Sequence, residues 1–217
     1  AIVDANYLPP QEDEETWDAL YTYGVQDYRI LERGGVPYVI FGLTGVDSDE
    51  CAPMSGMELS DPVETAKRVV KEATEKCQNA YGEDPVVICL SHSGTENGKG
   101  EDYELAQKVD GIDVIISGHT HTTLEQPIEV NDTYIVSAGE NSKNLGVLTL
   151  TRTQDGVELK DSRLVPVDER VPEDPEMAAW IEAAKSQVEQ DYLADFDLEF
   201  DQVLVDNPYQ FDTVDEV

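Results

Sequence analysis

The sequence has little positive charge, few histidines and cysteines, and no long apolar run. Lys and Arg number 14 against 47 Asp and Glu, which gives a net charge of −33. Such a surface repels the phosphates of DNA and RNA and anionic lipid headgroups, so binding to nucleic acid or to a membrane surface is disfavoured. No apolar run approaches the roughly 20 residues of a membrane-spanning helix, so we expect no membrane span.

The excess of acidic residues has two interpretations. The simpler one is a solvated acidic coat that serves solubility or life in salt. The other concerns the substrate, because a phosphate-bearing molecule must be attracted by something more positive than this chain. Metal ions are the obvious candidates.

The three cysteines, Cys51, Cys77 and Cys89, form an odd set without C-x-x-C spacing, and they do not decide the redox compartment. Cys89 lies in an apolar run and Cys77 on the apolar face of a predicted helix. Both are therefore expected to be small buried residues.

Four continuous apolar runs predict strands covered on both faces, in a chain long enough to bury a sizeable core. A helix between the first two runs begins at Asp61 as cap, with Pro62 in its first turn and Glu64 completing a capping box. Residues 102–109 predict a second, shorter helix. Strand and helix alternate, which indicates the α/β class with mixed sheets sandwiched by helices. The four runs are residues 36–44, 85–91, 112–117 and 133–138.

The apolar residues of the first helix recur every three or four positions and predict one packed stripe. The stripe consists of Val63, Ala66, Val70, Ala73 and Cys77.

Two antiparallel pairs are predicted beside these strands. Residues 25–33 alternate in polarity and should pair with the strand beginning at Val36, through a Gly-Gly turn. Residues 145–152 and 157–167 should form a hairpin with Asp155 and Gly156 at its tip.

The C-terminal fifth of the sequence differs in character. Asp174 and Pro175 begin a further predicted helix. Residues 194–217 are acidic and contain no basic residue, so they indicate an exit strand or linker.

All three histidines of the chain follow directly after predicted strands. His92 follows the second run, and His119 and His121 follow the third in the sequence GHTH. Ligands of open α/β sheets bind at the carboxyl ends of the strands. An H-x-H pair in extended backbone points both imidazoles the same way, a slight bend spreads them onto two adjacent ions, and Gly118 permits close backbone approach. Imidazole suits zinc, manganese, iron, nickel and copper.

The alternative for an isolated H-x-H pair is two loop histidines bonded to backbone. The arrival of His92 at the neighbouring strand end favours metal ligation. Three other segments do not match known motifs. "SHSG" lacks the G-x-S-x-G elbow of a serine nucleophile, and "GTENGKGED" lacks the Lys-Ser/Thr ending of a P-loop. "DSDECAPMSGMELSD" does not match a calcium-binding loop, so we expect an ordinary loop or the rim of a pocket.

Three segments carry a family resemblance. With them, the chain resembles the second half of a calcineurin-like metallophosphoesterase, and more narrowly the branch of 5′-nucleotidases, UDP-sugar hydrolases and 2′,3′-cyclic-nucleotide phosphodiesterases. The resemblance covers roughly residues 1–167. The segments are "VVICLSHSG", "LAQKVDGIDVIISGHTHT" and "YIVSAGENSKNLGVLTL".

The resemblance implies a two-metal site in part of an α/β/β/α sandwich. In that family two divalent metal ions clamp a phosphate while a metal-activated hydroxide attacks phosphorus. By resemblance, His92 and His119 bind one ion and His121 binds the other. Zinc, manganese, iron or a similar metal fits, and the substrate is a nucleotide or another phosphate ester.

The sequence departs from the family pattern in one large respect. The motifs D-x-H, G-D and G-N-H-E, which supply the other ligands and a histidine beside the leaving group, do not occur. We therefore expect residues 1–193 to be the C-terminal part of a catalytic domain, and residues 194–217 to lead to a nucleotide-binding domain. Three imidazoles without a carboxylate predict weak metal binding and no useful turnover from this chain alone.

The leading hypothesis is thus that the parent protein is a metal-dependent phosphoric ester hydrolase of the 5′-nucleotidase type. The alternative is a non-catalytic binding or scaffold module with a degenerate site, and a third is a separate chain that supplies the missing half. An exposed sheet edge predicts self-association or a covering partner. The resemblance alone implies an extracellular or cell-envelope location.

Overall fold

The computed structural model describes residues 2–96, 98–153, 156–206 and 208. The chain divides into two units, residues 1–168 and residues 169–217. All the strands and all three histidines belong to the first unit. Among the helices in the described part of the chain, none is both long and apolar enough to cross a membrane.

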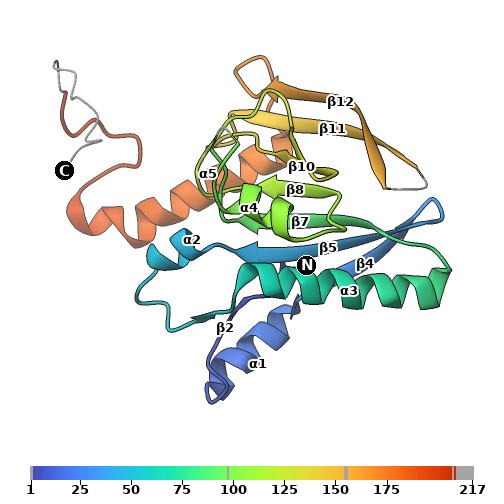
Figure 1. Ribbon diagram of the computed structural model, residues 1–217. Helices are drawn as coiled ribbons and strands as arrows, with labels where there is room; N and C mark the ends of the chain where they lie inside the picture. Colours follow the sequence, from blue (N-terminus) through green and yellow to red (C-terminus); the bar gives the residue numbers. More distant parts are fainter. Residues whose placement is uncertain (1, 97, 154–155, 207, 209–217) are drawn as a thin grey trace. The chain divides into compact units, whose positions relative to one another are not determined.

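The first unit is built on a mixed six-stranded sheet (Figure 1). Its four inner strands are parallel, and an antiparallel strand closes each edge. These inner strands correspond to the four apolar runs, so the predicted mixed α/β fold is confirmed. In sheet order the strands are β4 (Tyr28–Arg33), β5 (Val36–Thr44), β7 (Val86–His92), β8 (Val114–Ser117), β10 (Thr133–Val136) and β9 (Ile128–Val130).

The register of the parallel strands aligns their carboxyl ends. Thr44 pairs with His92 across β5 and β7, and Ser91 pairs with Ser117 across β7 and β8. The polar residues that follow these strands therefore meet at one edge of the sheet, as the sequence predicts.

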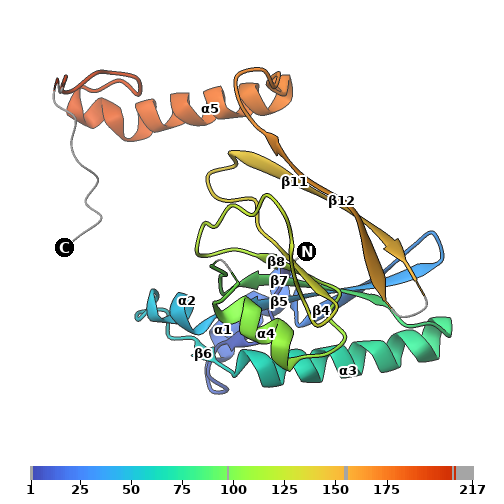
Figure 2. The same ribbon diagram turned by 45° about the horizontal axis from the view of Figure 1, so that its top comes forward.

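The two faces of this sheet have different cover. Helices α3 (Pro62–Tyr81) and α4 (Glu101–Lys108) lie against one face, and the β11–β12 hairpin (Asn144–Arg152, Val157–Pro166) lies on the other side (Figure 2). Apolar residues of the helix-covered face, among them Phe41, Cys89 and Ile115, are fully buried. On the other face Leu90 remains 40% exposed and Ile116 46% exposed.

Helix α3 begins as predicted, because the Asp61 carboxylate accepts the Glu64 N–H at 2.9 Å. The Glu64 side chain binds Lys67 at 2.8 Å, so only one half of the capping box is present. Helix α3 packs along the predicted stripe, but Val63 and Val70 are only partly buried. Val69 is fully buried, whereas Val70 packs partly exposed against the core.

Residues 25–33 form two strands, so the prediction of a single strand is wrong for their first part. β4 pairs antiparallel with β5, with Arg33 opposite Val36. β3 (Val25–Gln26) instead pairs in parallel with β1 (Ile2–Val3). The break falls at Asp27, a residue type that strands disfavour, whose carboxylate binds Arg68 at 2.8 Å.

The N-terminal segment joins the sheet edge through a buried asparagine. The Asn6 side chain is fully buried, donates to the Thr44 carbonyl at 2.8 Å and accepts the Thr44 N–H at 2.9 Å. These two hydrogen bonds hold the N-terminal segment against the carboxyl end of β5. Its elements are α1 (Glu14–Tyr23) and β2 (Tyr7–Leu8), which pairs antiparallel with β6 (Glu58–Leu59).

The predicted hairpin of residues 145–152 and 157–167 is confirmed as β11 and β12. Asp155, expected at its tip, lies outside the described residues, while Gly156 precedes β12 with a φ of 134°. Cys77 and Cys89 are both fully buried, as predicted.

The second unit contains the helix predicted at Asp174. The Asp174 carboxylate accepts the N–H groups of Glu176 and Met177, and α5 (Pro175–Asp191) follows. A short 3₁₀ helix, Leu193–Phe196, comes next. Residues 207 and 209–217 of the predicted acidic exit lie outside the described residues.

Candidate metal centre

His92 and His119 meet at the carboxyl ends of β7 and β8. Their ring centroids are 5.1 Å apart, with 66° between the ring planes. The two strand ends are joined directly, because the Gly118 N–H donates to the Ser91 carbonyl at 2.8 Å. A Cβ at position 118 would stand 3.2 Å from His92 Nδ1. Glycine therefore permits the close approach of this backbone to the His92 ring.

The backbone of the H-x-H pair is not extended, so that part of the sequence prediction is wrong. His119 has a φ of 73° and His121 a φ of 55°. The cause is a tight turn in which the Thr120 N–H bonds the Gly118 carbonyl at 3.0 Å. A non-glycine residue held in this left-handed region costs on the order of 1–2 kcal/mol, so the surrounding structure must enforce it.

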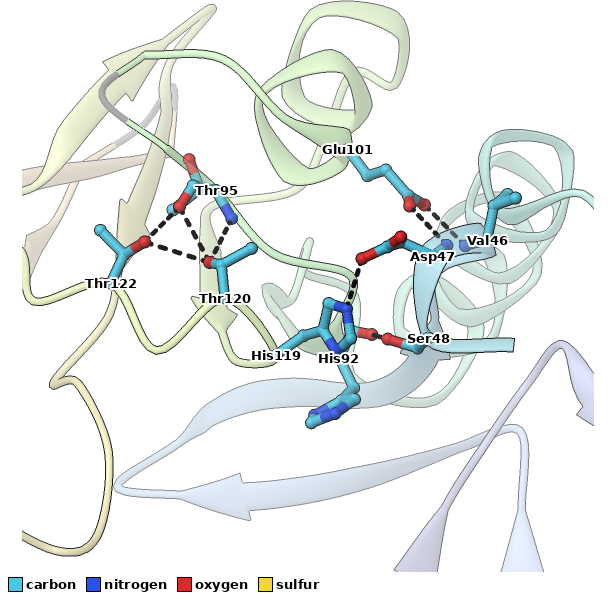
Figure 3. Close-up of polar contacts among 9 residues, drawn as sticks. All are labelled: Val46, Asp47, Ser48, His92, Thr95, Glu101, His119, Thr120 and Thr122. Carbon is cyan, nitrogen blue, oxygen red and sulfur yellow. Dashed lines mark hydrogen bonds and ion pairs between the residues drawn. The ribbon is translucent and has the colours of Figure 1, made fainter. Parts of the chain in front are cut away.

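A cluster of three threonines anchors this turn (Figure 3). The Thr120 hydroxyl accepts the Thr95 N–H at 3.2 Å and lies 2.9 Å from the Thr95 carbonyl. The Thr122 hydroxyl donates to the same carbonyl at 2.5 Å. Thr95 is itself fully buried, so the loop that carries both histidines is hydrogen-bonded to a buried residue.

A carboxylate orients the His119 ring. The Asp47 side chain reaches from the start of α2 (Val46–Glu50) to His119, with Oδ2 2.7 Å from Nε2 (Figure 3). Ligand histidines commonly donate their second ring N–H to a carboxylate, which fixes the tautomer. In His119 this partner places the proton on Nε2, so the lone pair of Nδ1 is free to coordinate a metal ion.

The start of α2 is in turn held by Glu101. Its carboxylate accepts the N–H groups of Val46 and Asp47 at 2.8 and 3.0 Å (Figure 3). These are N–H groups that a helix start leaves without a partner. The Ser48 hydroxyl also donates to the His92 carbonyl, which ties α2 to the end of β7.

His121 has a different partner. Its Nδ1 lies 3.0 Å from Glu140 Oε2, and 65% of its side chain is exposed. Lys143 binds the same carboxylate at 2.8 Å and is the main reason why the pKa of Glu140 is lowered. This arrangement leaves Nε2 of His121 as the unengaged ring nitrogen.

The surroundings of His92 favour its neutral ring. Burial lowers the pKa of His92, and the charges of His119 and His121 lower it further. A lowered pKa favours the neutral ring, which is the form that binds cations.

The donors present suit a divalent metal in type, and two of them are adjacent. Among the described residues, however, no group of three or more His, Cys, Asp or Glu is arranged to hold a metal ion. The structure thus brings His92 and His119 together and gives His121 its own carboxylate. The assignment of all three as metal ligands stays a prediction.

The sequence interpretation treated residues 47–61 as an ordinary loop or a pocket rim and missed two orienting residues, Asp47 and Glu101. One signal was available for Asp47, because it follows β5 by three positions at the same sheet edge as the histidines.

Comparisons with known proteins give one family match and several relatives. The model of the calcineurin-like phosphoesterase family matches residues 4–123. The trifunctional nucleotide phosphoesterase YfkN of Bacillus subtilis is 33% identical over 175 residues, covering 76% of this chain and 11% of that protein. Snake venom 5′-nucleotidase of Naja atra is 28% identical over 182 residues, covering 75% of this chain and 32% of that protein.

Among solved structures, the sulfate thiohydrolase SoxB of Thermus thermophilus matches with a TM-score of 0.65 and 24% identity. The match covers 88% of this chain and 32% of that one. This likeness concerns the fold. The chain spans about a third or less of the length of each of these relatives.

Proposed function

The chain belongs to the calcineurin-like phosphoesterase family, and we propose that it forms part of a two-metal enzyme that hydrolyses nucleotide phosphate esters. The relatives named as a nucleotide phosphoesterase and a 5′-nucleotidase support the substrate class. Residues 1–193 would act as the C-terminal part of the catalytic domain, and residues 194–217 as a link to a nucleotide-binding domain.

The observation that carries the proposal is the pair of adjacent imidazoles at neighbouring parallel strand ends. The rings of His92 and His119 are in edge contact, and Asp47 leaves one ring nitrogen of His119 free. A hydrogen-bonded pair of loop histidines would need neither the strained backbone of His119 nor the carboxylate behind it.

The proposed roles are those that the family resemblance implies, and the contacts described above are compatible with them. His92 and His119 hold one ion, and His121, oriented by Glu140, holds the other. When bound, two such divalent ions neutralise phosphate charge and lower the pKa of bound water. The protein's own contribution is to fix the directions of the three rings against a rigid sheet edge.

The chain's charge makes the metal ions necessary for substrate binding. A nucleotide phosphate is repelled by a net charge of −33, and among the described residues the ion-pair partners of His119 and His121 are carboxylates. In the part of the chain that the structure describes, no three or more His, Cys, Asp or Glu side chains are arranged to hold one metal ion. We therefore propose weak metal binding and no useful turnover by these 217 residues alone.

The experiment compares this chain with its parent protein carrying the D-x-H, G-D and G-N-H-E motifs. The parent protein, with Mn²⁺ or Zn²⁺, should release phosphate from nucleoside monophosphates, and the 217-residue chain should not. His119→Asn in the parent should lower the rate by at least about 100-fold, because a metal ligand is lost. A parent protein that binds no metal and releases no phosphate would defeat the proposal.

A non-catalytic module that kept the fold is the second candidate. One observation favours it, namely that the described residues hold no complete metal cage. It predicts that the parent protein, like this chain, takes up no metal. Metal analysis of the purified parent by mass spectrometry separates the two candidates.

Two further properties complete the proposal. A relative from snake venom supports an extracellular or cell-envelope location. Strands β4 and β9 form the two edges of the sheet, and we propose that they mediate self-association. A sedimentation experiment that finds only monomer at all concentrations would exclude the latter.

A further inference from the structure

Asp102, in the first turn of α4, is fully buried. Its Oδ1 accepts the Ser91 hydroxyl at 2.6 Å, and its backbone N–H donates to the Gly94 carbonyl at 3.1 Å. No cation pairs with it among the contacts of the described residues. A carboxylate so placed is costly to bury and requires a reason.

The second carboxylate oxygen faces the other strand end. Asp102 Oδ2 and Ser117 Oγ are both buried, and neither has a partner of good hydrogen-bond geometry. They are nevertheless neighbours: burial raises the pKa of Asp102, and the hydroxyls of Ser117 and Ser91 oppose that rise. The Ser117 hydroxyl thus lies close enough to Asp102 to lower its pKa, without a well-aligned hydrogen bond.

The two serines are the residues through which the histidines are positioned. Ser91 directly precedes His92, and Ser117 precedes His119 by two positions. Ser91 and Ser117 are register partners across β7 and β8. One buried side chain thus lies between the two strand ends that carry the adjacent imidazoles.

We propose that Asp102 is a positioning residue of the metal centre, which joins the ends of β7 and β8 and thereby sets the spacing of the His92 and His119 rings. The inference rests on the proposed function. Asp102 touches neither ring. It acts through the hydrogen bond that it accepts from Ser91 and through its contact with Ser117, not by supplying charge.

The test uses the 217-residue chain and Zn²⁺ alone, with binding measured by calorimetry. Asp102→Val keeps a branched side chain of similar size but removes both acceptors, and should weaken Zn²⁺ binding by about 10- to 100-fold, as loss of an outer partner of a metal ligand does. Asp102→Asn offers an acceptor to Ser91 and a donor to Ser117, so it should restore affinity to within about 3-fold.

Asp113→Val is the matched control. Asp113 is a partly buried carboxylate that accepts the Val87 N–H at 2.7 Å, but it lies at the opposite ends of β7 and β8. The control should unfold more easily than the native chain and still bind Zn²⁺ with unchanged affinity. Equal losses of affinity in both valine variants would reduce Asp102 to a general stabiliser and overturn the inference.

NMR of the metal-free chain tests the inference even if Asp102→Val does not fold or the native chain binds no measurable Zn²⁺. In the metal-free chain, NMR should detect the contact between the His92 and His119 rings, and Asp102→Val should abolish it. If Asp102→Val does not fold, Ser91→Ala removes the same hydrogen bond and should weaken the ring contact. If the native chain binds Zn²⁺ too weakly to measure, the parent protein still decides the proposed function, and the ring contact decides the role of Asp102. A folded Asp102→Val variant with native ring contact and native affinity would overturn the inference.

Discussion

The two ends of strands β7 and β8 are built in opposite ways. At the amino end, Asp113 accepts the Val87 N–H through its side chain and donates its own N–H to the Val87 carbonyl at 3.0 Å. The left-handed residues nearby are Gly111, Asn131 and Asp132, which tolerate that conformation best. The backbone there is locally consistent with its sequence.

At the carboxyl end, two of the left-handed positions are occupied by histidines. His119 and His121 take positive φ values, and two buried polar atoms nearby lack a well-formed hydrogen bond. Local rules of sequence preference are broken at this end and kept at the other. Strain and unsatisfied groups collect where a structure is shaped for a ligand, and the contrast therefore identifies the end that binds.

The largest effect that would sharpen this contrast should come from Asp47→Ala. The Asp47 side chain is 68% exposed, so its removal should leave stability nearly unchanged. Loss of the carboxylate frees the His119 ring to rotate and to change tautomer, and Zn²⁺ affinity of the chain should fall by about 10- to 100-fold. Calorimetric titration with Zn²⁺ measures it.

Asp49→Ala provides the control for Asp47→Ala. Asp49 lies on the same helix, and its replacement removes the same unit of charge, but no hydrogen bond or ion pair joins it to His119. It should change Zn²⁺ affinity by less than about 2-fold, since an exposed charge acts weakly at a distance. If both variants lose affinity equally, net charge and not ring orientation governs binding, and the carboxyl end is less specialised than we infer.

A smaller effect is expected when the anchor of the histidine turn is removed. Thr120→Val deletes the hydroxyl that accepts the N–H of buried Thr95. An unsatisfied buried N–H costs about 1–3 kcal/mol, and urea denaturation should show a loss of that size. The His119 turn should also relax, which would weaken Zn²⁺ binding.

Thr133→Val tests the same chemistry at the amino end. The buried Thr133 hydroxyl donates to the Ile112 carbonyl at 2.7 Å. Its loss should lower stability by a similar amount and leave Zn²⁺ affinity unchanged. A Zn²⁺ effect in Thr133→Val, or none in Thr120→Val, would break the comparison between the two ends.

The same contrast explains how much of the structure was predictable. The inner strands, α3, α4, the hairpin and the Asp174 cap follow from periodicity and capping residues, which act locally. The exception in the fold was residues 25–26, whose pairing with Ile2 and Val3 depends on a distant segment. Burial of Val69 in place of Val70 depends on the angle at which α3 packs, which no local pattern specifies.

At the site, the sequence located the histidines but not their support. Residues placed directly after strands must meet at one sheet edge, so the meeting of His92 and His119 was predictable. The left-handed turn was not, because the contacts that enforce it come from Thr95, 25 residues before Thr120. Nor was the approach of Asp47, which is 72 residues from His119.

The smallest effect concerns the amino end alone and its dependence on pH. Burial raises the pKa of Asp113, while its bond to the Val87 N–H and the charge of Arg152 lower it in part. A carboxyl whose pKa is higher in the folded state binds its proton more tightly there. Its stabilising contribution is therefore present below the unfolded pKa, near 3.8, and is lost as pH rises through the raised folded value.

Asp113→Asn cannot ionise, so its free energy of unfolding should fall less than that of the native chain between about pH 4 and neutrality. Urea denaturation at a series of pH values measures the difference, which should stay below the about 1–3 kcal/mol of a lost buried hydrogen bond, because the asparagine oxygen still accepts the Val87 N–H. Parallel pH profiles for the two proteins would mean that the Asp113 carboxylate is as well solvated as in the unfolded chain, and the amino end would then be even less strained than its geometry indicates.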